Sequence, residues 1–209
     1  MAMDIEIGRL PRARVRAASR LLAAAFADDG ILSHYLPGRR GRRLAIPAFF
    51  AAVIHEHLET TYAATAGREL VGVAAWAPPD PSTPPLASRF RARTRLLEVK
   101  ALFPSSSRQL FAGFRELERH HPPEPHWYLA FAGVHPARQG AGIGDALLQP
   151  AVAEADRAGV LCYLETPFPR THAFYQRLGF EIASTSRPFP SARPLDIMIR
   201  KPRPRAQIE

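Results

Sequence analysis

The feature that most constrains the fold is a predicted strand, a glycine-rich turn and a predicted helix that follow one another directly. Residues 127–134 read as a strand, residues 138–144 carry three glycines within five positions, and apolar residues then recur at helical spacing to about Ala158. Pro150 lies inside this helix, where it must remove one backbone hydrogen bond, so we expect a kink there. The order predicts an α/β chain with its glycine turn at a helix N-terminus.

The glycine turn is suited to holding an anionic group. Successive backbone N–H groups and the positive end of the helix dipole face one point, and glycines let the backbone approach a ligand without Cβ atoms in the way. The dinucleotide fingerprint fails because Asp145 follows where a third spaced glycine is needed, and the nucleotide-triphosphate loop fails for lack of its Lys and hydroxyl residue. A phosphate site and a purely structural glycine turn both stay open from these residues alone.

The other segments predict short strands and helices in alternation. The hairpin signal is Gly67-Arg68 between two apolar runs, and Pro104 with the following serines divides a longer helical pattern in two. We expect strands over residues 3–8, 60–66, 69–76, 160–165, 180–186 and 195–200, and helices over residues 15–26, 44–58, 86–121 in two parts, and 171–178. Residues 77–85 are predicted to form a Pro-rich loop and residues 201–209 a flexible tail.

Composition sets the class of protein. A chain of 209 residues, 46% apolar, fits one domain, which we place at residues 1–200. The net charge of +9 comes almost wholly from Arg, which a GC-rich genome explains as readily as a nucleic-acid surface, and we do not expect nucleic acid as the partner. One cysteine, Cys162, excludes an internal disulfide, and no apolar run is long enough to cross a bilayer. We therefore expect a soluble, cytoplasmic protein.

Two motifs together resemble a known family. Gln139-x-x-Gly142-x-Gly144 after a strand, followed about 30 residues later by Phe174-Tyr175-Gln176-Arg177-Leu178-Gly179-Phe180, is similar to the GNAT superfamily of N-acetyltransferases. Residues 22–28, 133–136, 164–166 and 169–170 look more closely like puromycin N-acetyltransferase and its relatives. The resemblance is weak over residues 29–124, from which this family usually builds part of its acceptor pocket.

The resemblance implies a mixed, twisted sheet with helices on both faces, splayed between the fourth and fifth strands to admit acetyl-CoA. It implies that pantetheine pairs with the fourth strand and that the pyrophosphate lies against the glycine turn. Relatives often carry Asn where this chain has Thr171, which can make fewer hydrogen bonds. The residues expected to contact the coenzyme are Ala132, Val134, Gln139, Gly140, Ala141, Gly142, Ile143, Gly144, Thr171 and Phe174.

Acetyl transfer to an amine needs an acid for the leaving thiolate and a base for the amine proton. The resemblance implies that Tyr175 is the acid, because a phenol pKa of about 10 suits protonation of a thiolate whose pKa is about 8.5. Glu165, at the end of a strand, is the candidate base. The structural alternatives are a core role for Tyr175 and an ion pair of Glu165 with a residue such as Arg170.

The sequence thus predicts an enzyme that acetylates a primary amine of a small molecule by direct attack in a ternary complex. The resemblance to a drug-modifying subgroup favours an antibiotic-like or aminonucleoside amine, with a role in antibiotic resistance. A protein or peptide acetyltransferase and a non-catalytic acyl-CoA-binding module are the alternatives.

The remaining histidines and the cysteine do not suggest a metal site. His55 and His57 are not spaced as metal ligands usually are, and we expect no metal. His120 and His121 are expected to be solvated, Cys162 to be a small buried residue, and the oligomeric state stays open, a homodimer included.

Overall fold

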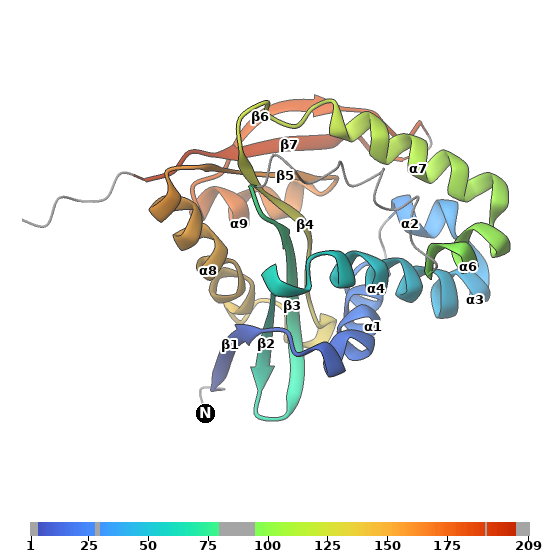
Figure 1. Ribbon diagram of the computed structural model, residues 1–209, viewed down its shortest axis with the longest axis horizontal. Coiled ribbons are helices and arrows are strands. Elements are labelled where there is room, and N and C mark those ends of the chain that lie inside the picture. Colours follow the sequence, from blue (N-terminus) through green and yellow to red (C-terminus); the bar gives the residue numbers. More distant parts are fainter. Residues whose placement is uncertain (1–3, 28–29, 80–94, 191, 204–209) are drawn as a thin grey trace, which may run out of the picture.

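A computed structural model of the chain describes residues 4–27, 30–79, 95–190 and 192–203. Its centre is a seven-stranded mixed sheet of order β1-β2-β3-β4-β5-β7-β6 (Figure 1). The β4–β5 pair is parallel and the other neighbouring pairs are antiparallel. The strands are β1 Ile5–Arg9, β2 Thr61–Ala66, β3 Glu69–Ala77, β4 His126–Val134, β5 Leu161–Thr166, β6 Glu181–Ser186 and β7 Leu195–Arg200.

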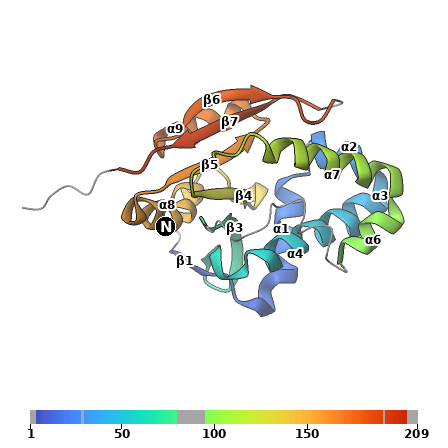
Figure 2. The same cartoon turned by 45° about the horizontal axis from the view of Figure 1, so that its top comes forward.

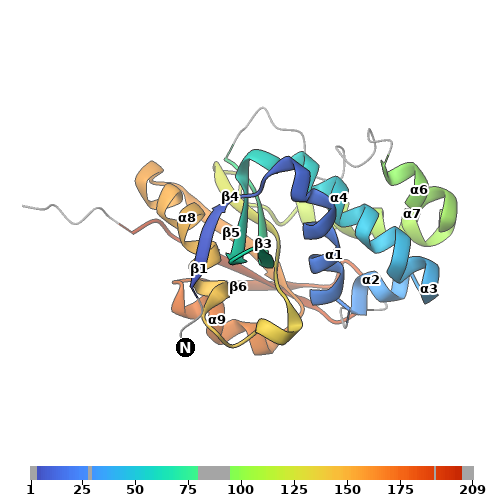
Figure 3. The same cartoon turned by 90° about the horizontal axis from the view of Figure 1, so that it is seen from below.

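Helices cover both faces of the sheet. On one side lie α1 Val15–Ala25, α2 Gly30–Tyr35, α3 Gly38–Arg40, α4 Ile46–Glu56, α6 Arg95–Leu102 and α7 Pro104–Glu118 (Figures 2 and 3). On the other lie α8 Ile143–Ala158 and α9 His172–Arg177. Each face has its own core, one centred on the aromatic residues of α4 and the other on the apolar stripe of α8.

Strands β4 and β5 are paired over only part of their length. Their register runs from His126 opposite Leu161 to Tyr128 opposite Tyr163 and stops there. Beyond that point β4 stays with β3 to Val134, and β5 stays with β7 to Thr166. The two strands therefore diverge toward their carboxyl ends, which confirms the predicted splay.

A bulge on β4 accompanies this divergence. Ala75 of β3 pairs with Phe131 while the next residue, Trp76, pairs with Leu129, so Ala130 is an extra residue on β4. An extra residue bends its strand and places two consecutive side chains toward the same face. Ala130 and Phe131 both contact the core on the α1 and α4 side. The bulge lies just beyond the last β4–β5 pair, where the two strands diverge.

The predicted fold class is confirmed, and the elements lie close to their expected positions. The hairpin at Gly67, the division of the helical pattern at Pro104 and strand β7 are found where the sequence placed them. Helix α8 is continuous through Pro150. Helices α2 and α3 were not predicted. Most of the expected Pro-rich loop and the end of the expected tail lie outside the described residues.

Candidate active site

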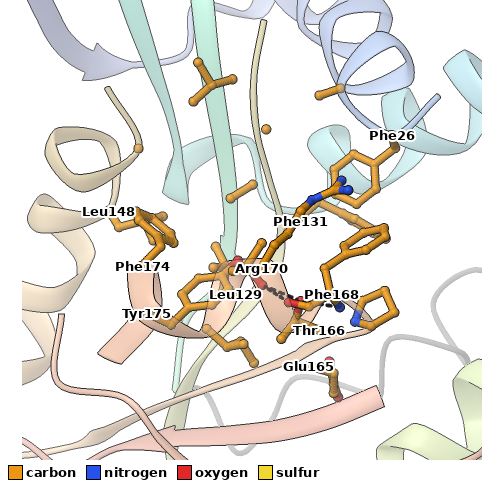
Figure 4. A pocket seen from close by; sticks show the side chains of 18 of the residues that line it. Phe26, Leu129, Phe131, Leu148, Glu165, Thr166, Phe168, Arg170, Phe174 and Tyr175 are labelled. Atoms are coloured by element: carbon orange, nitrogen blue, oxygen red, sulfur yellow. Dashed lines mark hydrogen bonds between the residues drawn. The ribbon is translucent and has the colours of Figure 1, made fainter. Parts of the chain in front are cut away.

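A cavity of about 590 Å³ opens where β4 and β5 diverge. It is lined by both strands, the turn after β4, the start of α8, helix α9, and residues of α1, α2 and α7 from the opposite face of the sheet. Figure 4 shows Leu148, Phe174 and Tyr175 on one side of the pocket and Phe26, Phe131 and Phe168 on the other. The cavity therefore joins the two faces of the sheet through the splay.

The glycine turn forms an open cradle at the N-terminus of α8. Gly140 and Gly142 have φ angles of 81° and 74°, which L side chains rarely adopt. A Cβ atom added at either position would meet no atom within 4 Å, so the space in front of both is open. Gly142 caps α8 without a side-chain hydrogen bond, which leaves the first N–H groups of the helix available to an anion.

The free edge of β4 presents backbone groups to the cavity. The His135 N–H donates to the Val71 carbonyl on β3, 2.8 Å away. Because backbone direction alternates along a strand, the N–H and C=O groups of Ala132 and Val134 point to the opposite edge, where β5 has already diverged. The Val134 carbonyl accepts a hydrogen bond from Gln139 Nε2 at 3.2 Å. This edge can pair with an extended ligand as another strand would.

Tyr175 lies on the α8 side of the splay, half-buried. Its ring packs against Phe174 and Phe180, with centroids 4.8 and 5.8 Å apart. Burial raises the pKa of the Tyr175 hydroxyl from 10.0 to about 12. The phenol therefore carries its proton at neutral pH and can donate it to an atom inside the cavity that Tyr175 lines.

Glu165 also lines the cavity, but its side chain is directed to the other face of the sheet. Its neighbours on β5, Leu164 and Thr166, alternate with it, and Leu164 belongs to the α8-side core. The carboxylate is 5% exposed, and its Oε1 lies 3.6 Å from Nε2 of His121. Arg170 does not pair with it. The guanidinium of Arg170 lies over the Phe168 ring instead, 4.5 Å from its centroid. Figure 4 shows Glu165 pointing away from Tyr175.

Residues 31–180 match the acetyltransferase (GNAT) family, about three-quarters of the chain. The chain belongs to this family. GNAT enzymes are acyl-CoA-dependent N-acyltransferases that use acetyl-CoA as cosubstrate. The phosphates of acetyl-CoA suit the cradle, and its extended amide-containing arm suits the β4 edge. Among the described helices, none combines the length and apolar character that crossing a membrane requires.

Solved structures share the fold of this acetyltransferase. One, named histone acetyltransferase HPA2 and related acetyltransferase, comes from Corynebacterium glutamicum and has 24% identity, a TM-score of 0.73, and 98% of this chain and 99% of that chain covered. The ribosomal-protein-S18-alanine N-acetyltransferase from Escherichia coli has 17% identity and a TM-score of 0.55, with 99% of both chains covered. An agmatine N-acetyltransferase has 14% identity and a TM-score of 0.64, with 95% and 99% covered.

Most of the residues predicted to hold the coenzyme lie together in this GNAT chain. Each of them except Ala141 lines the cavity. The side chain of Thr171 is already engaged locally, because its hydroxyl donates to the Phe168 carbonyl at 2.7 Å and lies 2.9 Å from the Thr166 hydroxyl. Thr171 therefore retains only acceptor capacity toward a coenzyme. The individual roles of these residues stay predictions.

The sequence did not single out the side chains behind Glu165. His121 was expected to be solvated, but its side chain is only 20% exposed and packs between the rings of Tyr128 and Tyr163, with centroids 4.6 and 4.4 Å away. The available signal was a histidine on each side of a proline-rich turn directly before β4. Cys162 is fully buried, as predicted. Within the described ranges no three His, Cys, Asp or Glu side chains come together as metal ligands would.

Proposed function

We propose that this GNAT enzyme transfers an acetyl group from acetyl-CoA to the primary amine of a small molecule with an apolar or aromatic body. The observation that carries the proposal is the position of Tyr175 and Glu165 on one cavity but on opposite faces of the splayed sheet. A thioester held along β4 would then have an acid on the thiol side and a base on the amine side. This arrangement supports direct attack, with no acyl-enzyme.

The proposed residue roles follow from proton balance. Glu165 accepts the proton that the amine loses as its nitrogen forms the new bond to the carbonyl carbon. A backbone N–H near Val134 donates to the oxygen that becomes negative, a preorganised contact that is often a large catalytic contribution. Tyr175 donates its proton to the thiolate that leaves when the carbon–sulfur bond breaks, and solvent then restores the phenol.

The wall on the Glu165 side supports a small apolar acceptor. Glu165 and Asp145 are the carboxylates that line the cavity, and Asp145 lies in the first turn of α8 with Arg177 3.7 Å away. A polyamine or an aminoglycoside carries several cations, for which one buried carboxylate is a poor match. The apolar lining on this side comprises Phe26, Ile31, Leu32, Phe114, Leu117 and Phe131.

An aminonucleoside or other antibiotic-like amine fits this description, and the sequence similarity of residues 164–166 and 169–170 to puromycin N-acetyltransferase adds support. A role in antibiotic resistance and a cytoplasmic location belong to the same proposal. A protein acceptor is the second candidate, because two of the structural neighbours are named for histone and ribosomal-protein substrates.

Release of coenzyme A thiol from acetyl-CoA tests the proposal against puromycin, an arylalkylamine, spermidine, an aminoglycoside and a short peptide with a free N-terminus. We expect turnover with puromycin or the arylalkylamine. Turnover confined to the peptide would replace the small-molecule acceptor with a protein. Acetyl-CoA binding by calorimetry with no turnover of any amine would favour a non-catalytic acyl-CoA-binding module.

A further inference from the structure

A chain of ring nitrogens leads from Glu165 toward the surface. The loop between α7 and β4 places His121 behind Glu165, with Nε2 3.6 Å from Oε1. The other ring nitrogen of His121, Nδ1, lies 3.0 Å from Nε2 of His126. Nδ1 of His126 lies 2.8 Å from the Glu124 carbonyl oxygen. His121 is absent from the cavity lining and contacts the site through Glu165 and through the ring of Tyr128, which lines the cavity.

The carbonyl at the end of this chain fixes the direction of every hydrogen bond in it. A carbonyl oxygen only accepts, so Nδ1 of His126 must carry a proton. A neutral His126 then has its lone pair on Nε2, and His121 must donate to it from Nδ1. A neutral His121 is therefore left with its lone pair on Nε2, facing Glu165.

The surroundings keep His126 neutral. Burial is the largest effect and lowers the pKa of His126 from 6.5. The hydrogen bond to the Glu124 carbonyl opposes it, and the charge of His121 lowers the pKa further, against a smaller effect of Glu165. The hydroxyls of Tyr128 and Tyr163 stay protonated, because burial, the charge of Glu165 and a hydrogen bond to the Glu165 side chain raise the pKa of both. Glu118 adds to this effect at Tyr128. These two phenols are the other donors beside the carboxylate. The preceding histidine, His120, is engaged elsewhere, 2.8 Å from the Ser186 hydroxyl.

Glu165 and the lone pair of His121 are thus two acceptors that face each other. Oε1 of Glu165 is buried and has no hydrogen-bond partner among the described residues. A buried acceptor without a donor is unfavourable, and a proton on either atom would draw the two from 3.6 Å into hydrogen-bond distance and satisfy both.

Resting on the proposed function, we propose that His121 is a positioning residue that receives from Glu165 the proton taken from the amine, and that His126 holds His121 in the tautomer able to do so. The N–H bond of the amine breaks as an O–H bond forms on Glu165. That proton then moves to Nε2 of His121, which becomes an imidazolium, and the partly exposed ring releases it to water. The carboxylate and the neutral imidazole are restored.

The tautomer can be measured without any substrate. Nitrogen NMR of histidine-labelled enzyme distinguishes protonated from unprotonated ring nitrogens. We expect the neutral His121 ring to carry its proton on Nδ1, and His126→Phe to remove this preference without unfolding the chain. A neutral His121 with its proton on Nε2 in the native enzyme would overturn the proposal.

Kinetics with the amine that responds in the thiol assay test the proton step. His121→Gln should lower kcat on the order of tenfold to a hundredfold, the range typical of a partner that supports a catalytic group. It should also remove one ionisation from the acidic limb of the pH profile and leave the KM for acetyl-CoA unchanged. His120→Gln, one residue earlier and bonded to Ser186, is the matched control and should behave as the native enzyme.

The outcomes separate the two proposals. A pH profile of His121→Gln identical to that of the native enzyme, in a protein that acetylates an amine, would overturn the proton step and leave the proposed function standing. A native enzyme that acetylates none of the amines would overturn the proposed function, and the proton step with it.

Discussion

At the scale of single residues, Tyr175 and Tyr62 provide a comparison of the same group in two settings. Burial raises the pKa of both hydroxyls to about 12. Tyr62 is a residue of β2, and its hydroxyl donates a hydrogen bond to Oε1 of Glu154 at 2.7 Å. This hydrogen bond raises the pKa of Tyr62 further. Tyr175 lines the cavity, and no hydrogen bond of its hydroxyl to a described residue is found. Because the Tyr175 hydroxyl is not engaged by a described side chain and Tyr175 lines the cavity, it is the better proton donor for a ligand.

Tyr175→Phe should lower kcat about a hundredfold, near the lower end of what general acid catalysis contributes. The KM for acetyl-CoA should change little, because the phenyl ring keeps its packing against Phe174 and Phe180. Steady-state kinetics at saturating acetyl-CoA measure this. Tyr62→Phe is the control and should retain its kcat. Equal turnover of Tyr175→Phe and the native enzyme would remove Tyr175 from the acid role.

The pKa of Tyr175 also sets a pH expectation. An ordinary tyrosine loses its proton near pH 10, whereas Tyr175 retains its proton to about pH 12. Loss of the acid should therefore not reduce kcat between pH 8 and about pH 11. A fall in kcat in that range that disappears in Tyr175→Phe would contradict the environment described for this hydroxyl.

At the scale of elements, the glycine turn and α8 act as one unit, since Gly142 is both the end of the cradle and the cap of the helix. Gly144 follows inside the first turn, where an added Cβ would lie 3.1 Å from the Phe174 ring. The helix start is thus packed against α9 on one side and open on the other. Only the open side can admit a ligand.

Gly142→Ala should weaken acetyl-CoA binding by more than about tenfold, because a methyl group would occupy the open cradle and strain the positive φ. Gly67→Ala is the matched control. Gly67 has a φ of 57°, an added Cβ there also meets no atom within 4 Å, and the residue lies in the β2–β3 hairpin away from the cavity. Both variants should lose a similar free energy of unfolding, and only Gly142→Ala should lose affinity in calorimetry. Equal affinities would contradict the coenzyme placement.

Some of these elements could be predicted from the sequence and others could not. Local signals were sufficient for the hairpin at Gly67, the helix boundary at Pro104 and the glycine turn, because turn chemistry and apolar spacing are local. Ala130 carries no local sign of a bulge, which arises only when β4 pairs with β3. The splay was expected from the family resemblance, and the residues that bend β4 were not.

The coenzyme side of the candidate site could be predicted from the sequence, and the acceptor side could not. The coenzyme side is formed by two motifs, each contiguous in the sequence, and the family resemblance that they carry implied its residues. The acceptor side combines residues from α1, α2, α7 and β4, which no single motif connects. His121 was missed for this reason, because its burial depends on Tyr128 and Tyr163 from two strands.

At the scale of the whole molecule, the ion pair of Arg200 and Asp156 connects strand β7 to helix α8. Arg200 at the end of β7 is 2% exposed and makes two hydrogen bonds to Asp156 of α8, at 2.7 and 2.8 Å. Its Nε donates to the Leu178 carbonyl at the end of α9. These contacts hold α8 and α9, which carry the cradle and Tyr175, against the same strand.

Removal of Asp156 should destabilise the fold more than removal of an exposed carboxylate. Asp156→Ala leaves the buried Arg200 guanidinium without its charge partner. Because the Asp156 side chain is 26% exposed and water can partly replace it, the loss should cost about 1.5–3 kcal/mol, the range for a hydrogen bond to a charged group. Glu116→Ala is the control, because Glu116 pairs with Arg119 on the exposed surface of α7, where such pairs contribute about 0.3–0.5 kcal/mol. Urea unfolding at pH 7 measures both losses, and equal losses would contradict the structural role of Arg200.

The same pair gives a pH dependence of known sign. The hydrogen bond from Arg200 lowers the pKa of Asp156 in the folded chain below its usual 3.8. The folded state therefore binds the proton more weakly than the unfolded state does, so the contribution is complete above about pH 4 and is lost as the pH falls through the folded pKa. Asp156→Asn should differ most from the native chain in free energy of unfolding at pH 7, and the difference should shrink in acid. A difference that stays constant from pH 7 to pH 3 would show that the stability does not depend on the charge of Asp156.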